Sequence, residues 1–113
     1  MSSSWIGQAE RAAWQRRAAA ELAAILDAHA DLPLITWTVG PAGSVLVGRV
    51  SGLFPAAQAR EVFTAWQKRL APGEAREDRM SGGTTALHAT AGSRKEVTVR
   101  LTATVHDDED GDL

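Results

Sequence analysis

The sequence contains no cysteine. This absence excludes disulfide bonds, thiolate metal ligands and a cysteine nucleophile, and it is typical of proteins of the reducing cytoplasm. The chain also lacks an apolar stretch approaching the roughly 18–20 residues that a membrane-spanning helix needs. Residues 1–5 do not lead from a basic segment into an apolar run, as a secretory signal peptide would. We therefore expect a cytoplasmic protein with no membrane partner.

The charge of the chain is unevenly distributed. Five of the 14 acidic residues lie in the last seven positions, which leaves nine acidic against 12 basic residues in the rest of the chain. The length of 113 residues is typical of one domain. We expect a mildly basic single domain at residues 1–106, followed by a solvated, disordered acidic tail at residues 107–113.

A weak internal repeat is the main clue to architecture. Residues 13–17 (AWQRR) recur as residues 65–69 (AWQKR), an offset of 52 positions. The same offset relates Ile35 to Leu87, Gly40 to Gly92, Val45 to Val97 and Val47 to Val99. Self-similarity at a fixed period indicates a duplicated structural unit. We predict pseudo-repeats at about residues 8–52 and 55–105.

Each predicted repeat contains one helix and two strands. Strong helix formers and spaced apolar residues predict helices at about 8–28 and 55–70. Alternating apolar residues predict strands at 34–39, 45–50, 84–90 and 97–105, and residues 71–83 read as a long polar loop. The order αββαββ predicts an α+β fold, with a four-stranded antiparallel sheet and both helices on one face. An approximate twofold axis would make Trp14 and Trp66 equivalent.

The predicted sheet leaves its second face uncovered. We expect Ile35, Trp37 and Val39 to point inward with Val45 and Val47, and Leu46 and Gly48 to point outward. The open face would then hold mainly threonine, which suits a solvated sheet. Either the face is bare, or it meets a protein partner or a second copy of the chain. The candidate partner-binding residues are Thr36, Thr38, Leu46, His88, Arg100 and Thr102.

No motif indicates catalysis. The three histidines are not at metal-ligand spacing, and neither glycine-rich turn matches a phosphate-binding loop. His88 has threonines nearby on the open face, but the predicted strand pairing places no carboxylate beside it, as a nucleophilic triad would require. We predict a non-enzymatic protein without catalytic residues, metal or cofactor, and no small-molecule ligand is evident. A small enzyme working near His88 is the least favoured reading.

Nucleic acid is the alternative partner. Arg16 and Arg17 on the first helix and Lys68 and Arg69 on the second would be related by the twofold axis, and a basic stripe of this kind is how phosphate contacts begin. The competing interpretation is an ordinary solvated helix surface, because the net charge is small and no aromatic platform is evident.

Residues 32–39 (LPLITWTV), 62–66 (VFTAW) and 83–87 (GTTAL) resemble short uncharacterised proteins of high-GC actinobacteria. The resemblance implies a bacterial, cytoplasmic protein and carries no catalytic residue or ligand. The favoured function is that of a small binding or regulatory accessory protein, which acts through protein–protein contacts or as a homodimer.

Overall fold

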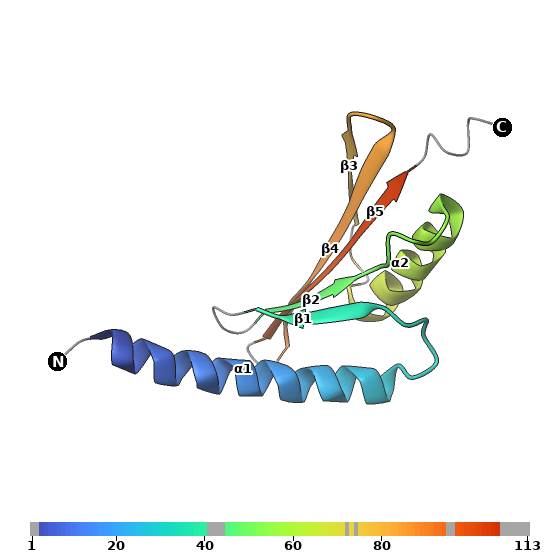
Figure 1. The fold of residues 1–113 in the computed structure, drawn as a ribbon. Coiled ribbons are helices and arrows are strands. Elements are labelled where there is room, and N and C mark those ends of the chain that lie inside the picture. Colours follow the sequence, from blue (N-terminus) through green and yellow to red (C-terminus); the bar gives the residue numbers. More distant parts are fainter. Residues whose placement is uncertain (1–2, 41–44, 72, 74, 95–96, 107–113) are drawn as a thin grey trace.

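The computed structural model describes residues 3–40, 45–71, 73, 75–94 and 97–106, and it describes the side chains of these except at 3–6 and 92–94. The acidic tail predicted at 107–113 lies outside the described residues. The fold is α+β, as predicted, and the described residues form two helices and five strands (Figure 1). The helices are α1 (Ser3–Ala28) and α2 (Ala56–Leu70), and the strands are β1 (Thr36–Val39), β2 (Val45–Arg49), β3 (Arg76–Met80), β4 (Thr84–Arg94) and β5 (Val97–His106).

Both helices end where the sequence predicts. After α1, the amide of His29 still donates to the carbonyl of Ile25 at 3.0 Å, and Pro33 then prevents any continuation. Helix α2 follows Pro55, whose fixed φ suits a helix start. The spaced apolar residues that predict α2 are buried: Ala59, Val62, Phe63, Trp66 and Leu70. In α1 burial follows the apolar spacing only in part, because Leu26 is exposed and Glu21 is buried.

Strand β3 lies within the segment that we predicted to be a loop. It pairs antiparallel with β4 through a three-residue turn, in which Gly82 and Gly83 take positive φ values of 82° and 76°. All five side chains of β3 are exposed. A strand without a buried face carries no apolar alternation, so periodicity does not reveal it. Its charged residues also suit an edge strand, because charge discourages pairing with other chains.

The sheet has the order β1-β2-β5-β4-β3 and is mixed. The predicted four-stranded antiparallel sheet is therefore wrong: β2 and β5 are parallel neighbours, with Val45 beside Thr98.

The αββ repeat is not confirmed either. A twofold axis perpendicular to the sheet would make these central strands antiparallel, whereas an axis along the strands would place the helices on opposite faces. Neither operation fits parallel central strands with both helices on one face.

The buried face of the sheet carries the core. Val97, Val99, Leu101, Ala103 and Val105 of β5 are all buried, as the alternation predicts. The orientation predicted for β2 is wrong. Its buried members are Leu46, which is fully buried, and Gly48, whereas Val45 and Val47 are half-buried on the other face.

Gly48 is required by close packing. A Cβ atom built at this position would lie 2.9 Å from Ile35 Cδ1, 3.0 Å from Trp37 Cη2 and 3.1 Å from Leu101 Cδ2. Such separations are tighter than van der Waals contact, so even a methyl group would displace buried side chains. The absence of a side chain at Gly48 is what lets the Trp37 ring lie against the sheet.

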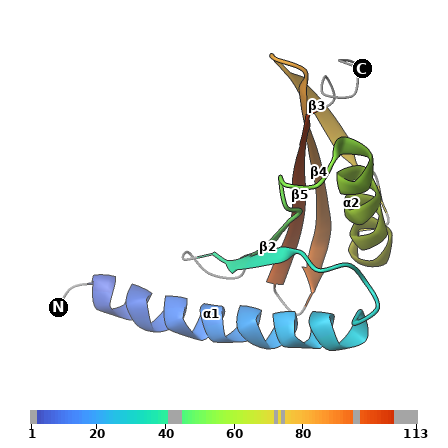
Figure 2. The same cartoon turned by 45° about the vertical axis from the view of Figure 1, so that its right-hand side comes forward.

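The helices meet the same sheet face in different ways. Helix α2 packs along β5 and β4, whereas α1 crosses the β1–β2 end of the sheet and extends well beyond it (Figure 2). The molecule measures 63 × 31 × 23 Å, and its radius of gyration of 16.3 Å exceeds the roughly 13 Å expected for a compact domain of this length. Of the described residues, no helix is apolar over a length that would cross a bilayer.

We predict that Gly48→Ala lowers the free energy of unfolding by about 1–3 kcal/mol, because the added methyl group overpacks the core. Gly52→Ala is the control. Nothing lies within 4 Å of a Cβ atom at Gly52, so its effect should stay within about 1 kcal/mol and should be stabilising if anything. Urea denaturation measures both values. Equal effects of the two substitutions would contradict the packing role of Gly48.

Candidate functional site

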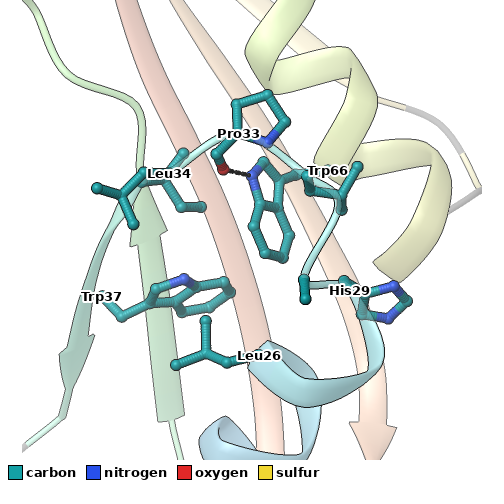
Figure 3. Close-up of a pocket in the computed structure, with 9 residues that line it drawn as sticks. Leu26, His29, Pro33, Leu34, Trp37 and Trp66 are labelled. Atoms are coloured by element: carbon teal, nitrogen blue, oxygen red, sulfur yellow. Dashed lines mark hydrogen bonds between the residues drawn. The ribbon is translucent and has the colours of Figure 1, made fainter.

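A partly enclosed cavity lies between the end of α1, the segment leading into β1, and α2 (Figure 3). Its volume is about 190 Å³. The walls are predominantly apolar: Leu26, His29, Ala30, Leu32, Pro33, Leu34, Ile35, Trp37 and Trp66. Apolar cavities with a few polar groups are the usual form of small-molecule sites.

Trp66 anchors the α1–β1 segment to α2. Its side chain is 3% exposed, and its indole Nε1–H donates to the carbonyl oxygen of Pro33 at 2.7 Å. The ring also contacts Trp37 edge to face, with centroids 5.5 Å apart, and His29, with centroids 6.2 Å apart. One buried ring therefore holds together three segments that are distant in sequence, and the hydrogen-bonding capacity of its N–H is used.

The indole N–H of Trp37, unlike that of Trp66, has no hydrogen-bond partner among the described residues. Its nitrogen, Nε1, is buried. A buried donor without a partner costs about 1–3 kcal/mol relative to one that is satisfied, and such groups are rare in folded proteins. In Figure 3 the nitrogen-bearing edge of Trp37 is turned toward the side of the cavity where Leu34 and Trp66 lie.

A surface ion pair lies at the rim of the cavity. Arg69 of α2 contacts Asp31 through two nitrogen–oxygen pairs, at 2.8 and 3.4 Å, and also lies 3.4 Å from Nδ1 of His29. The hydrogen bond from Arg69 holds the pKa of Asp31 below its ordinary value, with help from the Asp31 backbone. The rim thus contains one cation and one anion that largely compensate each other.

The open sheet face holds five of the six candidate partner-binding residues. Thr36, Thr38, His88, Arg100 and Thr102 lie on it, but Leu46 lies on the opposite face and is fully buried in the core. Thr36 and His88 belong to strands β1 and β4, which are three strand spacings apart, or roughly 14 Å. They therefore belong to one surface without forming one small site.

A carboxylate lies beside His88, contrary to our expectation. Asp78 of β3 is 3.5 Å from His88 Nε2 and 3.4 Å from Arg76 Nε. Thr102 occupies the position opposite His88 on β5. The imidazole is 41% exposed in a shallow hollow, however, whereas nucleophilic sites normally exclude water around converging groups. Sequence reasoning missed Asp78 because it missed β3.

The basic residues of the two helices do not gather in one place. Arg69 is paired with Asp31 beside His29, at the C-terminal end of α1. Arg17 precedes His29 by twelve positions, which is roughly 18 Å along a helix. Lys68 lies on an open surface with Glu61 and Thr64. The four residues Arg16, Arg17, Lys68 and Arg69 do not form the symmetric stripe that the repeat predicts.

Among the described residues, no group of three or more histidine and carboxylate side chains is arranged to hold a metal ion. No protein-family model matches the chain, and searches of curated proteins and of solved structures returned no match.

We predict that the pKa of the Asp31 carboxyl group lies below its ordinary value and that Arg69→Gln raises it. The ion pair contributes to stability above the unfolded-state pKa, and this contribution is lost as the pH falls through the folded-state pKa. NMR titration of the carboxyl carbon measures the midpoint. Lys68→Gln is the control, because Lys68 is the adjacent cation on α2 and should leave most of the depression in place. An unchanged midpoint in Arg69→Gln would contradict the assignment.

Proposed function

We propose that the protein is a non-enzymatic binding protein that acts as a homodimer, with the N-terminal half of α1 as its main contact surface. The observation that carries this proposal is the extension of α1 beyond the body of the molecule (Figures 1 and 2). We keep the cytoplasm as the proposed compartment, since a chain without cysteine needs no oxidising environment.

The N-terminal half of α1 has little to pack against within the monomer. The buried side chains of the helix, Ala18, Glu21 and Ile25, all follow residue 17, and no side chain described between residues 7 and 17 is buried. Most of the stability of helices in proteins comes from tertiary packing of one face. A partner that covers this segment would supply the contacts that the monomer lacks.

Trp14 is the residue best suited to the contact. It is only half-buried on the projecting segment. Tryptophan is enriched among the residues that dominate binding energy at protein interfaces, and covering its remaining surface contributes roughly 25 cal/mol for each Å² removed from water.

We favour a second copy of the chain as the partner. Two α1 helices that cross antiparallel would bring Trp14 of one copy against Trp14 of the other. A symmetric dimer of this kind is the commonest oligomer. The polar open face of the sheet is the second candidate contact, but threonine suits water there and the face gives weaker support.

We expect light scattering of the full chain to give about twice the monomer mass of 12.0 kDa. Trp14→Ala should return the mass to that of the monomer at the same concentration. Gln15→Ala is the matched control, because Gln15 is the exposed neighbour on the same helix. A wild-type protein that stays monomeric at all concentrations would overturn the dimer, and a dimeric Trp14→Ala variant would overturn α1 as its contact.

The nucleic-acid alternative has weaker support. Arg69 is neutralised by Asp31, and Arg60 lies 3.4 Å from Glu77, so part of the basic character of α2 is compensated locally. Under our proposal, the protein shows no binding to duplex or single-stranded DNA even at low salt. Binding that weakens steeply between 50 and 200 mM salt would instead favour the alternative, because release of counterions gives that dependence.

A further inference from the structure

The cavity beside Trp37 and Trp66 has no part in the proposed dimer. None of its lining residues lies in the N-terminal half of α1. It is formed where the chain leaves α1 and enters β1, and α2 closes it from the other side (Figure 3). A molecule bound in the cavity would therefore not contact the proposed dimer surface of α1.

The hydrogen-bonding groups of the cavity differ in whether they have a partner. The N–H of Trp66 is satisfied by Pro33, and Nδ1 of His29 lies close to Arg69 at the rim. The N–H of Trp37 is buried without an acceptor among the described residues. The remaining walls are predominantly aliphatic side chains. The cavity is thus a predominantly apolar space, and Trp37, one of the residues that line it, carries a buried donor without an acceptor among the described residues.

We propose that this cavity binds a small, uncharged, mainly apolar molecule with one acceptor oxygen, such as an aromatic or branched aliphatic ketone, ester or amide. The oxygen accepts the hydrogen bond from Trp37 Nε1. Because an apolar cavity of 150 Å³ holds benzene, the volume of about 190 Å³ holds a ring with a short substituent, or about ten non-hydrogen atoms.

A charged ligand is disfavoured. It would lose its hydration in an apolar space, and the cation nearest the rim, Arg69, is already paired with Asp31 at 2.8 Å.

The ligand needs only a small rearrangement to reach the donor. Because Nε1 of Trp37 is buried, an oxygen reaches it when a neighbouring side chain moves. Leu34 and Leu26 of the cavity wall are 89% and 43% exposed, so packing holds them only weakly. Leu34 can therefore fold over the bound molecule and cover it with its apolar surface.

Acetophenone, which has one ring and one carbonyl oxygen, is a suitable probe. We expect its titration into the full-length ¹⁵N-labelled protein to move one of the four indole N–H signals downfield, as a new hydrogen bond does. The signal that is missing from the spectrum of Trp37→Phe identifies Trp37. The wild-type spectrum tests the proposal even if the variant folds poorly, because assignment can then be made through the backbone.

The variants test the role of the donor. Trp37→Phe keeps an aromatic ring but removes the N–H, and it should weaken acetophenone binding by about tenfold, the effect of one ordinary hydrogen bond. Trp14→Phe, which alters a ring outside the cavity, should leave the affinity unchanged. The proposal is overturned if saturating acetophenone leaves the Trp37 signal in place, or if Trp37→Phe binds as tightly as the wild type.

Discussion

The contact of Trp37 with Gly48 on one side and Trp66 on the other is the interaction on which the described fold most depends. A bulky ring can lie against β2 only because the residue beneath it has no side chain, and the same ring meets α2 through Trp66. Through Pro33, Trp66 in turn fixes the segment that leads out of α1. Two helices and the edge of the sheet are thus joined by a pair of indoles, and the cavity is the space left where these large rings do not fill the corner.

The contact between Trp37 and Trp66 lies between two parts of the molecule that differ in burial. On the sheet side, α2 and the C-terminal half of α1 bury a continuous core against β2, β5 and β4. Beyond it, α1 continues as a projecting helix whose described side chains are all at least partly accessible. The proposed dimer contact and the proposed ligand cavity therefore lie on different parts of one helix. Occupancy of one need not obstruct the other.

The helices and the terminal strand were predictable from sequence because each has a strong local signal. Alanine, glutamate and arginine favour helix over most of α1, and Pro33 ends it. Strand β5 alternates without interruption. The buried face of strand β2 was ambiguous from the sequence. Val45 and Val47 point to one side of the strand, whereas Leu46 and Val50 point to the other, and either set could face the core. The repeat favoured the wrong phase by aligning Val45 and Val47 with Val97 and Val99, and only the packing around Gly48 decides between them.

The candidate sites were harder to predict from the sequence than the fold was. The inward direction of Trp37 follows from alternation in β1, but its position beside Trp66 depends on how segments 29 positions apart meet. Asp78 comes beside His88 only through β3, an edge strand with no apolar pattern. The parallel pairing of β2 with β5 could not be read from the hydrophobic pattern, which is the same for either direction.

That parallel pairing has a consequence for biosynthesis. Val45 and Thr98, which lie side by side, are 53 positions apart, and contacts of such long range slow folding because a large loop must close before they form. As the chain emerges from the ribosome, the inner edge of β2 stays unpaired until β5 has been made. A truncated product that lacks β5 would expose that edge together with the apolar side of α2, and such surfaces promote aggregation.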